Sequence, residues 1–414
     1  MTHDADSVLL TEPGTAKNAD SDIARPRLDN VDMLRGLAIV LMSLDHVREF
    51  LSAAQYSPTD VANTTAALFF TRWVTDFCAP VFVFLAGTGA YLYGRRVHST
   101  AHASRFLLTR GLWLVVLELT VIRLAWFFNF DYASGSVGQV IWTIGWSMVV
   151  MSGLVFLPIS AITTIGILLI AFHNVFDPVS ADSFGENWAW LWRFLHAGGG
   201  VTPFSGVPVH VAYPLIPWVG VMAAGYGFGP LLKLPQGKRR VETLALGIVL
   251  TLTFFGLRAT NMYGDPGQWS SHPEFVRTLL SFLALQKYPP SLLFLLMTLG
   301  PALIVLAAAD RPLGKFGHFL VIYGRVPLFY YVLHLFVIHA LTIGIVYLQC
   351  QETPAWLFSF PPGHAGQDSA GNNCGVDLPV LYGIWLGVVV ALYPLCRWFA
   401  GVKRRRRDAW LSYL

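Results

Sequence analysis

The sequence has little charge and little cysteine. Aspartate, glutamate, lysine and arginine make up 13% of its 414 residues, against about 25% in a typical soluble domain, whereas 55% of the residues are hydrophobic. This lack of charge excludes an ordinary soluble globular protein and predicts an integral membrane protein in a lipid bilayer. Four cysteines exclude a disulfide scaffold, and their spacing matches no metal-binding motif. We expect neither a bound metal nor a nucleic-acid partner.

Apolar runs of helical length recur along the chain. A helix of about 20 apolar residues crosses a bilayer. Ten such runs are present, at 31–51, 72–94, 106–129, 138–157, 159–176, 211–232, 241–258, 290–309, 322–348 and 378–400. The sequence therefore predicts an all-α, polytopic membrane domain over 27–402. Residues 1–26 are polar and lack the apolar core of a signal peptide, which predicts a disordered cytoplasmic tail, and 403–414 form a basic tail.

Basic residues indicate how the ten runs are oriented. Most arginines and lysines outside the runs fall in connections that lie on one side of the membrane if the count is ten. These connections include 25–27, 95–105, 233–240, 311–315 and 403–407. The positive-inside rule assigns this side to the cytoplasm and therefore places both termini there.

The first apolar run lies in RLDNVDMLRGLAIVLMSLDHVREF at 27–50, and it carries ionisable side chains that a lipid-facing helix excludes. They are Asp32, Arg35, Asp45, His46 and Glu49. Each such group costs about 2.5–3.5 kcal/mol at membrane depth, so it marks a functional site by default. Arg35 and His46 share one helix face and lie about 16 Å apart along the axis. This stripe predicts a functional site, and interhelical ion pairs are the alternative interpretation.

Further candidates lie in three other runs. Asp76 is expected at a depth similar to that of His46, and Arg110 is near the cytoplasmic start of the third run. Tyr330 and His334 belong to the ninth run. For His334 alone, an interhelical hydrogen bond is an equally good interpretation.

The four cysteines fall into two kinds. Cys350 and Cys374 bracket the last outer connection, where an oxidising environment would allow them to pair. Cys78 and Cys396 lie inside apolar runs and are expected to be packing residues.

Several segments together resemble one known family. In VDMLRGLAIVLMSLDH at 31–46, an Arg-Gly pair opens the first run and a histidine follows eleven residues after the arginine, as in transmembrane acyltransferases. Three further segments are similar to the bacterial relatives of heparan-alpha-glucosaminide N-acetyltransferase. They are FTRWVTDFCAPVFVFLAGTGAYL at 70–92, YPLIPWVGVMAAGYGFG at 213–229 and GRVPLFYYVLHLFVIH at 324–339. The resemblance extends over most of the membrane domain.

The resemblance implies a transferase that moves an acyl group, acetyl in this family, from acyl-CoA on the cytoplasmic side. The acceptor would be a hydroxyl or amine of a glycan or lipid-linked molecule at or beyond the membrane. Arg35 and Arg110 would hold the anionic CoA phosphates. The bacterial relatives imply the cell membrane, here an inner membrane, as location. The acceptor's identity does not carry over with the family, and a homo-oligomer is left open.

The implied chemistry also assigns roles to the other candidates. His46 would activate the acceptor as a base or carry the acyl group, and Asp76 would orient its ring. His334 or Tyr330 would donate a hydrogen bond to the oxyanion of the transition state. Asp45 and Tyr330 are further candidates for substrate binding.

The chain departs from the lysosomal enzyme of this family at the catalytic histidine. In that enzyme the histidine follows the first helix, and asparagine stands at the position of His46. Residues 47–97 contain no histidine here. If the chain is an acyltransferase, either His46 takes this role, as in the broader acyltransferase-3 family, or the chemistry differs.

A proton-coupled transporter or a lipid or sugar flippase is the alternative function. Ten spans with a charged stripe and buried histidines suit proton-coupled transport as well. The pattern RLDNVDMLRG has no second copy in the later half of the chain, so no internal repeat of the kind found in many transporters is visible.

The orientation of the runs generates a prediction. A reporter fused after Leu414 should be cytoplasmic, and one inserted near Gly366 should be external, because basic connections alternate with less basic ones. Paired phosphatase and fluorescent-protein fusions measure both positions. Finding the two reporters on the same side would contradict the ten-span count.

Overall fold

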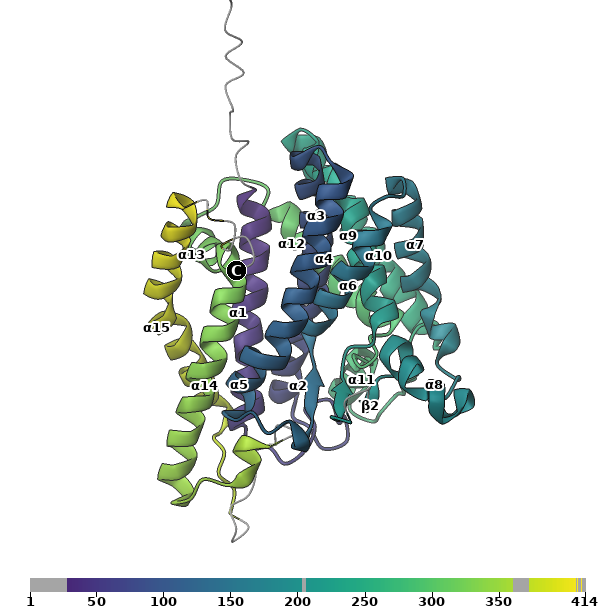
Figure 1. The fold of residues 1–414 in the computed structure, drawn as a ribbon. Helices are drawn as coiled ribbons and strands as arrows, with labels where there is room; N and C mark the ends of the chain where they lie inside the picture. The colour runs from purple at the N-terminus through teal and green to yellow at the C-terminus, as the bar shows by residue number, and fades with distance from the viewer. Residues whose placement is uncertain (1–27, 203–205, 360–371, 407, 409–410, 412–414) are drawn as a thin grey trace, which may run out of the picture.

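The computed structural model describes residues 28–202, 206–359, 372–406, 408 and 411, and these residues are largely helical. The tail expected at 1–26 lies outside them. Helix α1 (Asp29–Leu51) runs through the interior of the bundle, and most of its residues are buried. Figure 1 shows α1 in purple between two groups of helices. The helix with the unusual charges is therefore in contact with both groups.

Three helices of the C-terminal part pack on one side of α1. They are α13 (Lys315–Arg325), α14 (Pro327–Cys350) and α15 (Leu378–Arg405). The other group contacts α1 through α3 (Cys78–Val97) and α12 (Leu292–Ala308). Its remaining long helices are α4 (Thr100–Leu117), α6 (Val140–Leu154), α7 (Ile159–Phe172), α9 (Leu215–Phe228) and α10 (Gln236–Thr260).

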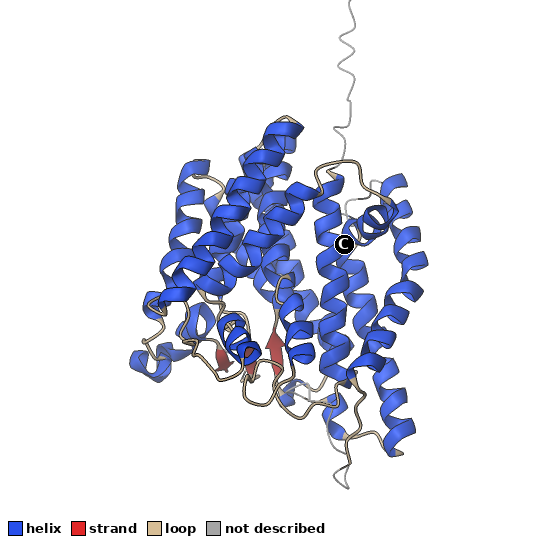
Figure 2. Cartoon of the chain, turned by 180° about the vertical axis from the view of Figure 1, so that it is seen from behind, coloured by secondary structure: helices blue, strands red, loops and turns tan. Residues whose placement is uncertain are grey.

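Shorter elements join the long helices. The α-helices are α2 (Ala66–Thr75), α5 (Arg123–Phe127), α8 (Gly185–Trp192) and α11 (Phe275–Leu283). Single turns of 3₁₀- or π-helix lie at Glu118–Ile122, Tyr132–Ser134, His173–Phe176, Ala181–Phe184, Arg193–Ala197, Gly229–Lys233 and Ala355–Phe358. A small sheet has the order β1 (Ser136–Gly138), β3 (Val209–Val211), β2 (Gly199–Val201), with β1 parallel and β2 antiparallel to β3. Figure 2 shows these strands at one end of the bundle.

The helices correspond to the expected runs, and six segments have the length and apolar composition to cross a membrane. These are Ala66–Val97, Ile159–Phe176, Leu215–Lys233, Gln236–Thr260, Pro327–Cys350 and Leu378–Arg405. Val140–Leu154 and Leu292–Ala308 are apolar but shorter. The charges of α1 set it apart from these segments. A helical membrane protein is therefore confirmed, whereas the count of ten spans stays a prediction.

Three expected runs are interrupted: the second is divided between α2 and α3 at Asp76 and Phe77, and local backbone chemistry breaks the third and the ninth. The ninth run is divided between α13 and α14 at Val326, because Pro327 has no N–H and disfavours helical backbone in the residue before it. The third run contains a π-helical turn, Glu118–Ile122, between α4 and α5. The breaks in the third and ninth runs lie beside the candidate residues, so they change where side chains near the site point.

Helix α1 approaches α13 at two glycines. A Cβ atom on Gly36 would lie 1.9 Å from the backbone oxygen of Leu320, and one on Gly324 would lie 1.7 Å from the backbone oxygen of Asp32. Backbone contact of this kind is a common way for membrane helices to associate, because lipid gives apolar side chains little reason to pair. The Arg-Gly pair of the first run thus includes a packing position.

The cysteines behave as expected. Cys350, the last residue of α14, forms a disulfide with Cys374, and Cys78 and Cys396 are buried free thiols. Beyond Cys374 the chain pairs with the end of α1, where the Val376 N–H donates to the Leu51 carbonyl at 2.7 Å. The disulfide therefore lies next to a contact that joins α1 to the segment before α15.

The α1–α13 contact generates a prediction. Gly324→Ala should lower the free energy of unfolding by about 1–3 kcal/mol or more, because the new methyl group overlaps the Asp32 carbonyl and the helices must separate. Gly344→Ala is the matched control, since nothing lies within 4 Å of its added Cβ. Thermal unfolding of both variants in the same detergent measures the difference. Equal melting temperatures would contradict the close contact.

Candidate active site

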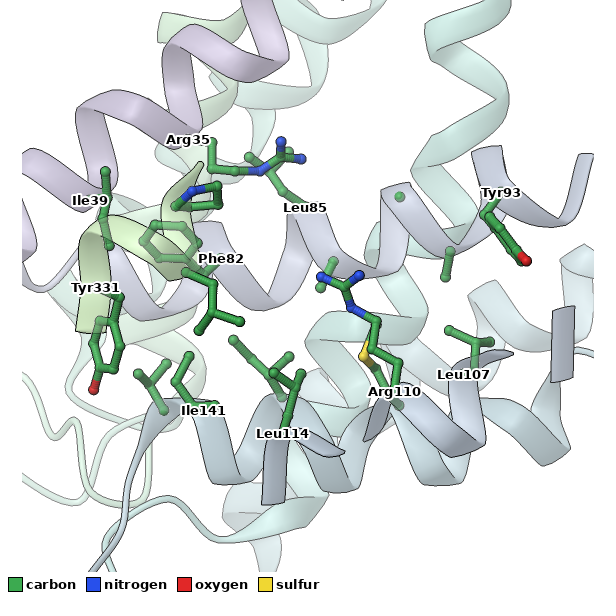
Figure 3. Close-up of a pocket in the computed structure, with 18 of the residues that line it drawn as sticks. Arg35, Ile39, Phe82, Leu85, Tyr93, Leu107, Arg110, Leu114, Ile141 and Tyr331 are labelled. Atoms are coloured by element: carbon green, nitrogen blue, oxygen red, sulfur yellow. The ribbon is translucent and has the colours of Figure 1, made fainter. Parts of the chain in front are cut away.

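A cavity of about 440 Å³ opens between α1, α3, α4, α6 and α14. The cationic side chains that line it are Arg35, Arg96, Arg110, Arg325 and Lys403, and the described lining includes no carboxylate. Most other lining residues are apolar. In Figure 3 the guanidinium groups of Arg35 and Arg110 project into the space. The cavity therefore suits a ligand with an anionic head and a less polar arm.

The two ends of the cavity differ. Tyr93 and Tyr331 lie at opposite ends in Figure 3, with Arg110 nearer to Tyr93. Met42 also lines the cavity and precedes His46 by four residues on α1. Four residues rise about 6 Å along the axis of an α-helix. The His46 ring therefore lies just beyond the wall that Met42 and Tyr331 form. A ligand's arm would thus point towards His46.

His46 forms a hydrogen-bonded pair with His334 of α14. Their Nδ1 and Nε2 atoms are 2.8 Å apart, and the two rings are inclined by only 6°. The Nδ1 atom of His334 is 2.7 Å from the Tyr330 backbone oxygen, which can only accept, so this nitrogen carries the proton. In the neutral ring, Nε2 of His334 then accepts from His46 Nδ1. His46 is left with a basic lone pair on Nε2.

Both rings are held by buried aromatic neighbours. His46 is 6% exposed and His334 is fully buried. Trp126 meets the His46 ring edge-on with 5.2 Å between centroids, and Tyr330 stacks on His334 at 4.9 Å. Ring flips in such a site are hindered, so the pair is preorganised for proton transfer.

The structure places Asp76 and Asp45 away from the role expected for a carboxylate that orients His46. Asp76 contacts Arg72 at 2.5 Å and Lys287 at 3.4 Å. Asp45 accepts from Arg48 at 2.9 Å and lies 3.6 Å from Arg72. The orienting position of His46 Nδ1 is occupied by His334 instead. The two carboxylates belong to an ion-pair network beside the histidine pair.

Tyr330 and His334 are close to His46 but do not supply the donors expected of them. The Tyr330 hydroxyl donates to Ser43 Oγ at 2.9 Å, and neutral His334 uses its single N–H on the Tyr330 carbonyl. Tyr331, which the sequence reasoning passed over, lines the cavity instead. Neighbouring positions on a helix differ by 100°, so the choice between two consecutive tyrosines depends on helix rotation, which the sequence does not reveal.

Arg35 and Arg110 both lie where the sequence reasoning expected them, on the wall of one cavity. Arg35 also pairs with Asp32 at 3.0 Å and donates to the Gly324 carbonyl at 3.2 Å. The ion pair with Asp32 lies within α1, and the contact of Arg35 with α13 is a hydrogen bond to a backbone carbonyl, so neither is the interhelical ion pair of the alternative interpretation. Within the described residues, no group of three or more His, Cys, Asp or Glu side chains could hold a metal ion.

A family model described as heparan-alpha-glucosaminide N-acetyltransferase, catalytic, matches residues 27–264, more than half of the chain. The matched interval includes α1 to α10, with Arg35, His46 and Arg110. His334 and Tyr331 lie beyond it. No curated protein matches the chain.

The lining of the cavity generates a prediction. Arg110→Gln should weaken binding of coenzyme A by about 10- to 100-fold at low salt, because a charge-assisted contact is worth about 1.5–3 kcal/mol. Arg397→Gln, a change of an exposed arginine on α15 outside the cavity, is the control and should bind normally. Isothermal titration of the purified variants measures both affinities. Equal affinities would show that the cavity does not bind the coenzyme.

Proposed function

The chain belongs to the family of heparan-alpha-glucosaminide N-acetyltransferase catalytic domains, and from this premise we propose its reaction and its site. Membership of this family of membrane transferases implies acetyl-CoA as donor and a glycan as acceptor. In our proposal the acetyl group leaves CoA at the inner end of the cationic cavity and passes to a hydroxyl or amine of a sugar-like acceptor at or beyond the membrane.

One observation carries the proposal: a cavity lined by five cations ends beside a histidine whose basic nitrogen is fixed by a hydrogen-bond chain. The phosphates of CoA need cations, and Arg35 and Arg110 can supply bidentate contacts. The thioester arm is less polar and suits the apolar walls between Leu107 and Ile141. The cavity lining therefore offers both the cations that the CoA phosphates need and the apolar wall that the thioester arm needs.

His46 is the proposed base. As the acceptor's nucleophilic atom attacks the acetyl carbon, His46 Nε2 takes the acceptor's proton, and the C–S bond to CoA breaks. The same proton then goes to the CoA thiolate, so that free CoA leaves as a thiol. His334 accepts from His46 Nδ1 throughout and shares the positive charge of the intermediate imidazolium, which is the role first assigned to Asp76.

The orientation in the membrane completes the proposal. Lys403 near the end of α15 and Arg35 near the start of α1 line the same cavity, so both ends of the membrane domain lie at the same level. This supports a membrane domain of 27–402 with ten spans and both termini in the cytoplasm, where acetyl-CoA is made. The location proposed is the cell membrane.

Proton-coupled transport is the second candidate, because a buried ion-pair network lies beside the histidine pair. Arg72 and Lys287 share Asp76, and all three side chains are largely buried. Such networks are typical of proton relays in transporters. The two functions differ in a simple measurement, since only a transferase releases CoA in a fixed ratio to acetylated product.

The base generates a prediction. His46→Ala should lower kcat by about 10²–10⁴-fold, the contribution of a positioned general base, while the affinity for CoA stays close to that of the parent. His318→Ala, an exposed histidine on α13, is the control and should retain activity. The assay follows transfer from [¹⁴C]acetyl-CoA to glucosamine, a model amino-sugar acceptor, together with release of CoA.

Two results would contradict the proposal. Undiminished transfer by His46→Ala would remove His46 from the mechanism. Stable ¹⁴C label on the parent protein without acceptor, absent from His46→Ala, would show that His46 carries the acetyl group instead of acting only as a base.

A further inference from the structure

Two hydrogen-bond donors beside the histidine pair have no partner among the described residues. They are the Tyr331 hydroxyl and the Trp126 indole N–H, on side chains that are 1% and 2% exposed. A buried donor without an acceptor is destabilising, and native proteins keep few of them. Two unpaired donors next to each other would destabilise the fold, so their presence calls for a functional reason.

The two donors meet at the inner end of the cavity. Tyr331 lines the cavity from α14, and the Trp126 indole N–H on α5 lies near its hydroxyl oxygen without forming a well-aligned hydrogen bond to it. Both rings approach His46 edge-on, with centroid distances of 5.9 Å for Tyr331 and 5.2 Å for Trp126. Figure 3 shows the Tyr331 hydroxyl at the end of the space away from Tyr93 and Arg110. The base and both donors therefore border one small region.

Three other polar groups around this region are already paired. The Tyr330 hydroxyl donates to Ser43, the His334 N–H donates to the Tyr330 carbonyl, and Glu118 accepts from the Trp142 N–H at 3.1 Å. The two donors thus remain after the structural hydrogen bonds of their neighbours are formed. An incoming acceptor atom would satisfy both.

We propose that the Tyr331 hydroxyl and the Trp126 N–H form the oxyanion hole of acetyl transfer, an inference that rests on the proposed function. When the acceptor's nucleophilic atom bonds to the acetyl carbon, the carbonyl π electrons move onto oxygen, and His46 Nε2 takes the acceptor's proton. The two donors bind the resulting oxyanion. The electron pair returns as the C–S bond breaks, and the CoA thiolate takes the proton from His46.

The support behind Trp126 fits this role. The π-helical turn at Glu118–Ile122 inserts an additional residue into the third run and so shifts the helical phase of α5, which carries Trp126. Such turns are frequent at functional sites. Arg123 of α5 donates to the Gly135 carbonyl and to Ser136 Oγ, and these bonds connect α5 to the start of β1. The Trp126 indole N–H therefore belongs to a segment whose position is fixed by hydrogen bonds.

Tyr331→Phe is the first test, because it removes the hydroxyl and keeps the ring. It should lower kcat by about 10²–10³-fold, the usual effect of losing one oxyanion-hole donor, with the affinity for acetyl-CoA within about twofold of the parent. Tyr323→Phe is the matched control. Its buried hydroxyl donates to the Val389 carbonyl at 2.6 Å, so its loss should lower the melting temperature and leave kcat unchanged.

A second variant, Trp126→Phe, and an infrared measurement test the inference without relying on Tyr331→Phe alone. Trp126→Phe should also lower kcat with little change in acetyl-CoA affinity. The ¹³C carbonyl band of bound [1-¹³C]acetyl-CoA should lie at higher wavenumber in each variant than in the parent, because a donor to the carbonyl is lost. A general structural defect would lower stability and move affinity and kcat together.

Three outcomes overturn the inference. Parent kcat in both Tyr331→Phe and Trp126→Phe would show that neither donor stabilises the transition state. If neither variant folds, a parent carbonyl band at the position seen in an apolar solvent would exclude the proposed hydrogen bonds. A parent that neither binds acetyl-CoA nor transfers label would reject the proposed function, and the inference with it. In contrast, normal transfer with unaffected variants rejects the inference alone.

Discussion

The hydrogen bond between His46 and His334 is the interaction on which the candidate site depends. It joins α1 to α14, and the Tyr330 carbonyl at its far end decides which nitrogen of each ring is protonated. A pair of neutral imidazoles has no charge in its resting state, so it can be buried at lower cost than the pair of His46 with the Asp76 carboxylate that the sequence suggested. The carboxylates of Asp45 and Asp76 are then free to pair with neighbouring arginines and a lysine.

Much of this arrangement could be predicted from the sequence, because it depends on position along a single helix. The apolar runs predict the helices, since a bilayer fixes their length. Arg35 and His46 lie eleven residues apart on α1, and the structure puts Arg35 on the cavity wall and His46 just past its inner end. Gly36 was recognised as part of the Arg-Gly pair, and its packing role follows from its missing side chain.

The rest depends on how helices are rotated against one another, and a single sequence holds little information on that. Asp76 lies in the same region as His46, as expected, but Arg72 is one turn before it on α2 and binds it first. Tyr331 was missed in favour of Tyr330 because a difference of 100° between neighbours can be resolved only against a partner helix. Trp126 lies after a π-helical turn, which shifts every side chain beyond it relative to a regular α-helix.

The separation of the two histidines along the chain, 288 residues, has a consequence for biosynthesis. A chain that is still being synthesised can insert α1 and assemble much of the cationic cavity long before α14 leaves the ribosome. During that interval the Nδ1 atom of His46 has no partner to fix its proton, and Tyr331 is absent from the inner end. The site proposed for acetyl transfer is therefore complete only after the last fifth of the chain has been inserted.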